Sequence, residues 1–326
     1  MIIRKKEHWF KMLLIWRGSV LPSLLPQLLL LLAWSLAIVI FKDTIFQYSL
    51  HLNPAPFTLF GIALALFLGF RNNASYDRFW EGRKLWGSLV NTSRALARQA
   101  LTLPDAEPAN TGTPQPAPRP HSVAPPQPAD STLFINYAIA LAYTLKHQLR
   151  QTDATADQER LLPPELAARL RKVRFAPTAL IQEMGRWVQQ ARIKGQLDSI
   201  RQKAFDENLN QLADIIGGCE RIAGTPLPYS YSVLIHRTVY IYCFLLPLGL
   251  LDSLGWMMPP IVVFMAYTYT ALEAIAEELE DPFGTSPNDL ALDTMCRTIE
   301  NSLLEMDDRP LLPDPPPASP NTYYLT

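Results

Sequence analysis

Four long apolar segments constrain this chain more than any other feature. The first, Leu24 to Phe41, runs for 18 residues without a charge, close to the ~20 residues with which a helix crosses ~30 Å of hydrocarbon. A second runs from Pro54 to Phe70, and two more cover Thr238 to Leu251 and Trp256 to Ala276. Prolines interrupt the last two, which is tolerated where neighbouring helices satisfy the backbone. The sequence therefore predicts an all-α membrane protein with four transmembrane helices in two hairpins.

Basic residues predict the orientation of these spans. They cluster before the first span and after the second, at Arg4, Lys5, Lys6, Lys11 and Arg17 and at Arg71, Arg78, Arg83 and Lys84. The connection between those two spans holds one Lys and one Asp. Because cytoplasmic loops carry the excess of Lys and Arg, both termini and the middle of the chain are expected in the cytoplasm.

The chain is expected to divide into six parts. They are an N-terminal amphipathic cytoplasmic segment (1–23), transmembrane helices 1 and 2 (24–71), a helical cytoplasmic domain (72–229), transmembrane helices 3 and 4 (230–276), a cytoplasmic C-terminal segment (277–307) and a proline-rich tail (308–326). No alternating strand pattern appears, and Gly195 and Gly217–Gly218 are predicted helix stops. The proline-rich stretch 103–130 is predicted to be a disordered linker loop.

Composition and motifs argue against several functions. A net charge of −1 gives no basic field for nucleic acid. The three cysteines and five histidines are scattered, without metal-ligand spacing or a catalytic motif. We therefore expect neither an enzyme nor a cofactor or metal site. Two alternatives stay open: a membrane enzyme with a metal site in the carboxylate-rich segment Glu273–Asp281, dependent on Glu277, and a non-conducting scaffold that uses the proline-rich loop.

The segment from Gly61 to Val90 passes from apolar to polar without a helix stop. In its apolar half, Ile62, Leu66 and Phe70 recur every four residues, so they span about 80° and ~12 Å of one helix face. The stripe has two interpretations. It faces lipid or another helix, as is usual for a membrane helix, or several copies of it form a narrow apolar neck that controls ions through their hydration.

Longer motifs resemble the bacterial branch of the bestrophin family. They are "FLGFRNNASYDRFWEGRKLWG" (67–87), "GGCERIAGTPLPYSY" (217–231), "AEELEDPFGTSPNDLAL" (276–292) and the opening "RKKEHWFKMLLIWRGSVLPSLLPQLL". In register, they cover nearly the whole chain. Only the proline-rich loop and the tail look like additions.

The resemblance implies a homopentameric ion channel in the bacterial inner membrane, with a single axial pore. It places the family's apolar neck on Ile62, Leu66 and Phe70, as passive rings rather than ligands. A second, cytoplasmic constriction falls on Leu180, with Ile181 as the alternative. The family's animal members bind calcium through acidic residues after the Pro-Phe-Gly element; here Thr-Ser-Pro-Asn-Asp follows, so no such clasp is expected.

The resemblance also implies passive conduction of small monovalent ions, with cations such as Na⁺ and K⁺ favoured and chloride as the alternative. Asp77, Glu81 and Glu273 are candidate pore-flanking charges that would concentrate cations. Arg71, Arg78 and Arg83 lie on the same helix, however, and the sequence does not show which of these charges face the lumen. Membrane lipid, the permeant ions and further copies of the chain are the expected partners.

Overall fold

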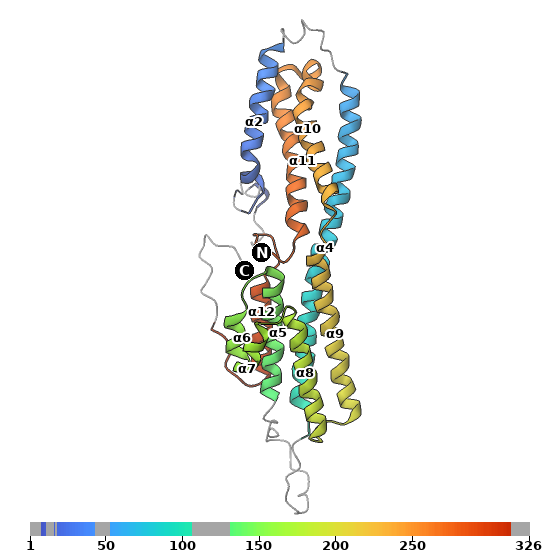
Figure 1. Ribbon diagram of the computed structural model, residues 1–326. Helices are drawn as coiled ribbons and strands as arrows, with labels where there is room; N and C mark the ends of the chain where they lie inside the picture. The colour runs from blue at the N-terminus through green and yellow to red at the C-terminus, as the bar shows by residue number, and fades with distance from the viewer. Residues whose placement is uncertain (1–7, 11–15, 17, 43–52, 106–130, 314–326) are drawn as a thin grey trace, which may run out of the picture. The chain divides into compact units, whose positions relative to one another are not determined.

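A computed structural model describes residues 8–10, 16, 18–42, 53–105 and 131–313. Most of the expected N-terminal segment and of the proline-rich loop, and the end of the tail, lie outside these residues. The described chain is helical, without strands, as the sequence predicts. Its elements are α2 (Leu21–Ile40), α4 (Pro54–Thr102), α5 (Ser131–Arg150), α6 (Thr155–Leu161), α7 (Pro164–Leu170), α8 (Ala176–Ile193), α9 (Ser199–Gly224), α10 (Tyr229–Leu254), the 3₁₀ helix η1 (Gly255–Met257), α11 (Met258–Glu280) and α12 (Leu292–Met306) (Figure 1).

The chain forms two compact units. The first comprises Met1–Glu81, Thr225–Pro282 and Ser286–Asp289, and the second Gly82–Gly224, Phe283–Thr285 and Leu290–Thr326. Helix α4 is continuous through its 49 residues and contributes residues 54–81, with its whole apolar part, to the first unit and residues 82–102 to the second. The helix without a stop that the sequence predicts is therefore confirmed.

The first unit holds the segments that can cross a membrane. Among the described residues, three stretches are long and apolar enough: Leu21–Ile40, Pro54–Thr102 and Tyr229–Glu280. The third comprises α10, η1 and α11, and its two helices run antiparallel, because His236 contacts Glu273 while Tyr242 contacts Tyr269. Leu and Val side chains of α2, α4, α10 and α11 build its apolar core.

The second unit is built around α5, which is buried along most of its length. Phe134 packs against Trp187 of α8 and Phe205 of α9, with ring centroids 4.6 and 5.6 Å apart. Near Gly218 of α9, a Cβ would come within 2.9 Å of Leu85 of α4. Gly218 therefore serves close helix packing, and the predicted stop at Gly217–Gly218 is wrong, because α9 continues to Gly224. Gly195, at φ +73°, does follow the end of α8.

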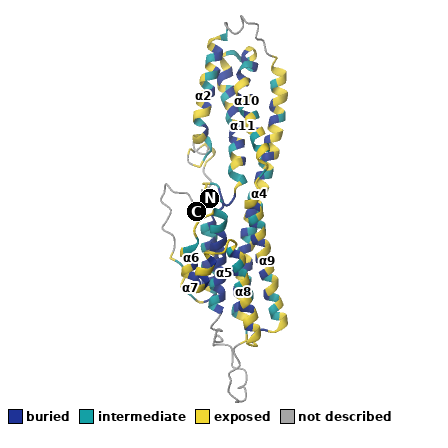
Figure 2. Cartoon of the chain, viewed as in Figure 1, coloured by how far each residue is buried: buried dark blue, intermediate teal, exposed yellow. Residues whose placement is uncertain are grey.

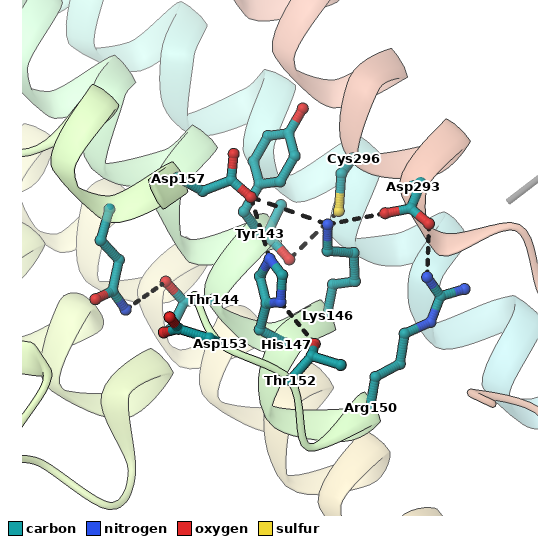
Figure 3. A network of polar contacts seen from close by, with 12 residues as sticks. Tyr143, Thr144, Lys146, His147, Arg150, Thr152, Asp153, Asp157, Asp293 and Cys296 are labelled. Atoms are coloured by element: carbon teal, nitrogen blue, oxygen red, sulfur yellow. Dashed lines mark hydrogen bonds and ion pairs between the residues drawn. The ribbon is translucent and has the colours of Figure 1, made fainter. Parts of the chain in front are cut away.

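Charged side chains cross-link α5, α6 and α12 in the second unit (Figure 3). Lys146 Nζ lies 2.8 Å from Asp293 Oδ1, Arg150 Nη1 lies 2.6 Å from Asp293 Oδ2, and His147 Nε2 lies 3.1 Å from Asp157 Oδ2. Burial acts to raise the pKa of Asp293, but the hydrogen bonds from Lys146 and Arg150 outweigh it and hold that pKa below its usual value. We interpret this network as structural.

Candidate pore helix

The stripe of Ile62, Leu66 and Phe70 lies on an exposed face of α4. Figure 2 colours much of the upper part of this helix as exposed. These side chains are 65%, 57% and 56% exposed, whereas Leu64 and Leu68 are almost fully buried. On an ideal helix the buried pair lies roughly 180° away from the middle of the stripe. The stripe is therefore directed away from the other helices of its own unit.

Tyrosine hydroxyls fix the back of α4 against α10 and α11. Tyr242 Oη donates a hydrogen bond to the carbonyl oxygen of Phe57 (3.3 Å), and Tyr269 Oη donates one to that of Gly61 (3.2 Å). The two tyrosine rings meet edge to face, 5.6 Å apart. A Cβ at Gly61 would lie 2.5 Å from Tyr242 Oη, so only glycine permits this approach. Phenols that reach a partner in this way fix the rotation of α4 about its axis.

Ionic contacts continue this attachment where the stripe ends. Arg71 follows Phe70 directly but is only 4% exposed. Its guanidinium lies 3.8 Å from Glu273 Oε1 and 3.8 Å from Glu280 Oε2 of α11, and its Nε has no hydrogen-bond partner among the described residues. The charge of Arg71 is thus balanced by two carboxylates at the back of α4.

Two neighbours of Arg71 strengthen the same attachment. Asn72 Nδ2 donates hydrogen bonds to the carbonyl oxygens of Leu68 (2.9 Å) and Leu272 (3.1 Å), the second on α11. Arg78 donates through Nε to the carbonyl oxygen of Glu280 (3.1 Å). These arginines therefore lie opposite the apolar stripe, which answers the question that the sequence left open for Arg71 and Arg78.

The three candidate flanking charges lie in different surroundings. Asp77 is exposed and, seven residues after Phe70, shares its helix face. Glu81 is half-buried. Glu273 is 6% exposed, and its Oε1 accepts a hydrogen bond from His236 Nδ1 (2.7 Å) besides facing Arg71. Glu273 is therefore a buried ion-pair partner in this arrangement rather than a pore-flanking charge, which corrects the expectation from sequence.

The candidate cytoplasmic constriction also needs a correction. Leu180 has no exposed surface, because it points into the core of the second unit. Ile181, the next residue of α8, is partly exposed. In this arrangement Leu180 does not line an opening, and a constriction at Ile181 stays a prediction.

Glu278 and Glu280 of the carboxylate-rich segment make protein contacts, whereas Glu277 is exposed. Glu280 Oε1 accepts the backbone N–H of Leu227 (3.0 Å), and Glu278 Oε2 accepts a hydrogen bond from Asn288 Nδ2 (2.6 Å). Among the described residues, no group of three His, Cys, Asp or Glu side chains could hold a metal ion. The segment thus offers no support for the enzyme alternative.

The loop that follows α11 carries a carboxyl group with a perturbed pKa. Asp289 is 4% exposed, and its Oδ2 accepts the backbone N–H of Ser286 (2.7 Å). Burial raises the pKa of Asp289 to about 6, against the effect of this hydrogen bond and with help from the charges of Asp281 and Glu278. Asp289 therefore gains or loses its proton near pH 6.

Sequence reasoning missed the tyrosines and the pairing of Arg71. A signal was present, because a phenol or guanidinium in or beside an apolar span must find a partner. The partner itself could not be identified, since Gly61 and Tyr242, or Arg71 and Glu273, are about 200 residues apart in the chain.

Known proteins resemble this chain along almost its whole length. Residues 1–305 match the family model described as Bacterial/Fungal Bestrophin protein. A protein of Ralstonia nicotianae named voltage-dependent anion channel-forming protein is 48% identical over 96% of this chain and 97% of its own length. A protein of Escherichia coli with the same descriptive name is 37% identical over 96% of both chains. The crystal structure of a bacterial bestrophin homologue from Klebsiella pneumoniae superposes with a TM-score of 0.78 at 40% identity, covering 88% of this chain and 99% of that one.

The match to the family model over residues 1–305 and the relative of 48% identity both identify the same family. They agree with the all-helical structure and with its membrane-capable helices. The chain belongs to the bacterial and fungal branch of the bestrophin family, whose members are ion channels and not enzymes.

Proposed function

We propose that five copies of the chain surround one axial pore, with Ile62, Leu66 and Phe70 of each α4 forming a narrow apolar neck. The orientation of α4 carries this proposal. Its polar and ionic contacts lie on the buried face, while an apolar stripe of about 12 Å is exposed on the other face. Apolar rings of this kind act on ions through hydration, because a dry neck is closed and a wetted one conducts.

The proposed membrane arrangement uses four spans in each subunit. These are α2, the apolar half of α4, α10 and α11, with both termini in the cytoplasm of a bacterial inner membrane. The antiparallel course of α10 and α11 supports two spans within the third apolar stretch. The basic residues on either side of the first two spans support the orientation.

Cations are the proposed permeant ions. The first charge beyond the neck on the exposed face of α4 is Asp77, whereas Arg71 and Arg78 are held on the opposite face. Five Asp77 carboxylates around one axis would raise the local concentration of Na⁺ or K⁺. This arrangement favours passive conduction of small monovalent cations.

Anion conduction is the second candidate, and two observations favour it. The relatives of Ralstonia nicotianae and Escherichia coli are named voltage-dependent anion channel-forming proteins. In addition, exposed Lys84 follows Asp77 on the same face of α4, about 10 Å further along.

Single-channel recording under a tenfold NaCl gradient separates the two candidates. A cation channel reverses near the Na⁺ equilibrium potential, at most about 59 mV from zero, and Asp77→Asn should shift the reversal potential toward zero. Asp252→Asn, at an exposed position of α10, is the matched control and should shift it little. Reversal at the chloride potential, with Lys84→Gln shifting it toward zero, would establish the anion channel instead.

The scaffold alternative is tested by removing residues 103–130. A channel should keep its conductance without this loop. Loss of a bound partner with no conductance in either form would favour the scaffold.

A further inference from the structure

An apolar cleft in the first unit opens between α2 and α10. It has a volume of about 490 Å³, and α11 forms its floor. Its lining residues are Gln27, Leu28, Leu30 and Leu31 of α2, Tyr240, Ile241, Cys243, Phe244 and Leu245 of α10, and Ala266 and Thr270 of α11. All three helices belong to the candidate membrane spans.

Two bridges between α2 and α10 frame this cleft. At one level Tyr240 Oη donates a hydrogen bond to Gln27 Oε1 (2.8 Å). At the other, Trp34 stacks on Phe244 with ring centroids 4.8 Å apart and donates from Nε1 to its carbonyl oxygen (3.1 Å). The floor residue Ala266 has a small side chain, so space remains between the bridges. The cleft is thus held open by specific contacts.

The surroundings of the cleft determine what can fill it. Leu30, Ile241 and Phe244 are exposed at its rim. An apolar cavity stays dry, because water finds no hydrogen-bond partners there. At the depth of a membrane span, the medium around the rim is hydrocarbon. An acyl chain from the bilayer therefore fits the cleft.

Charged side chains mark one end of the cleft. Arg237 precedes Ile241 by one helical turn on the same face of α10, and Glu277 follows Thr270 by two turns on the same face of α11. Both are exposed, and neither has an ion-pair partner among the described residues. Because His236 lies opposite Glu273 and the two helices are antiparallel, Glu277 lies about 7.5 Å further than Arg237 toward the C-terminal end of α11.

This order of charges matches a zwitterionic headgroup. We propose that the cleft binds one phosphatidylethanolamine molecule, with an acyl chain between α2 and α10, the phosphate on Arg237 and the ammonium on Glu277. Arg237 supplies a guanidinium for the phosphate oxygens. Glu277 accepts hydrogen bonds from a primary ammonium, which a choline headgroup cannot donate. The proposal depends on membrane insertion of α2, α10 and α11 and not on the neck of α4.

Native mass spectrometry of the purified full-length assembly tests this site. The delipidated protein is titrated with phosphatidylethanolamine, phosphatidylcholine and phosphatidylglycerol that carry identical acyl chains. We expect phosphatidylethanolamine to bind about tenfold more tightly than phosphatidylcholine, as one charge-assisted hydrogen bond provides. Arg237→Gln should weaken phosphatidylethanolamine and phosphatidylglycerol alike. Glu277→Gln should abolish the preference over phosphatidylcholine, and Glu277→Lys should favour phosphatidylglycerol.

Two further variants separate the cleft from general effects. Lys203→Gln removes a charge from a position of the second unit whose side chain is 78% exposed, and it should leave lipid binding unchanged. Ala266→Leu fills the floor and should lower retention of all three lipids. Equal retention of the three lipids by the unmodified protein overturns the proposal. The proposal is also overturned if Arg237→Gln and Glu277→Gln dissociate the pentamer but retain their lipid, because another subunit would then cover the cleft.

Discussion

The buried pair of Arg71 and Glu273 allows a quantitative test of how α4 is held. Glu273→Leu leaves the Arg71 guanidinium, 4% exposed, with only Glu280 at 3.8 Å. An uncompensated buried charge costs about 3–5 kcal/mol. Since Glu280 remains, we expect a loss near the lower end, about 3 kcal/mol. Arg71→Met should cost about 2 kcal/mol, because Glu273 keeps its hydrogen bond from His236 at 2.7 Å.

The double variant carries the decisive information. With both charges replaced by apolar side chains, no buried charge of the pair is left without a partner, and such replacements are often neutral or stabilising. Arg71→Met/Glu273→Leu should therefore lie within about 1 kcal/mol of the unmodified protein. The coupling between the two sites would then exceed about 3 kcal/mol, more than neighbouring residues usually show.

The assay is reversible unfolding by SDS titration in mixed micelles, followed by circular dichroism. The exposed pair of Lys203 and Glu207, with Nζ and Oε1 3.8 Å apart, is the matched control. Its cycle should give a coupling of less than about 0.5 kcal/mol. If the losses from Arg71→Met and Glu273→Leu simply add in the double variant, the reasoning that these groups compensate one another is refuted.

Three further predictions concern the neck, the second constriction and pH. Leu66→Ala and Phe70→Ala should widen the neck and raise ion flux into reconstituted vesicles; unchanged flux counts against their place in the pore. Ile181→Ala should raise single-channel conductance, whereas Leu180→Ala should cost about 2–5 kcal/mol of unfolding free energy and leave conductance unchanged; the reverse pattern would restore Leu180 as the constriction. Burial raises the folded-state pKa of Asp289 to about 6, so between about pH 4 and pH 6 this carboxyl keeps its proton in the folded protein and loses it in the unfolded chain. The destabilising effect of Asp289 therefore grows as pH rises through this range and stays constant above it. Asp289→Asn should therefore add about 1–3 kcal/mol of stability at pH 7 and little at pH 4, and equal effects at both pH values would contradict the assignment.

The fold was largely predictable because its main signal is local. The apolar runs 24–41 and 54–70 and the uninterrupted polar continuation of the second run correspond to α2 and α4. Apolar length and the absence of a helix breaker are read from neighbouring residues alone. The same local reasoning failed at Gly218, where the glycine accommodates Leu85 instead of ending the helix. A distant packing contact leaves no trace at that position of the sequence.

The candidate site was predictable only in part. The periodicity of Ile62, Leu66 and Phe70 defines a stripe but not its direction, since the rotation of α4 depends on Tyr242, Tyr269 and other distant partners. Charges carried the same ambiguity. Glu273 looked available to the pore until its contacts with Arg71 and His236 were known. For the same reason, the sequence could not show that Leu180 points into the core while Ile181 is partly exposed.

Chemical modification of Phe70→Cys tests most directly whether this face of α4 lines the conduction path. The native cysteines Cys219, Cys243 and Cys296 are buried, so a positively charged methanethiosulfonate reagent should act on the introduced thiol. We expect it to reduce single-channel current irreversibly in Phe70→Cys and to leave Leu234→Cys, exposed on α10, unaffected. Full modification of Phe70→Cys with unchanged current would show that ions pass elsewhere.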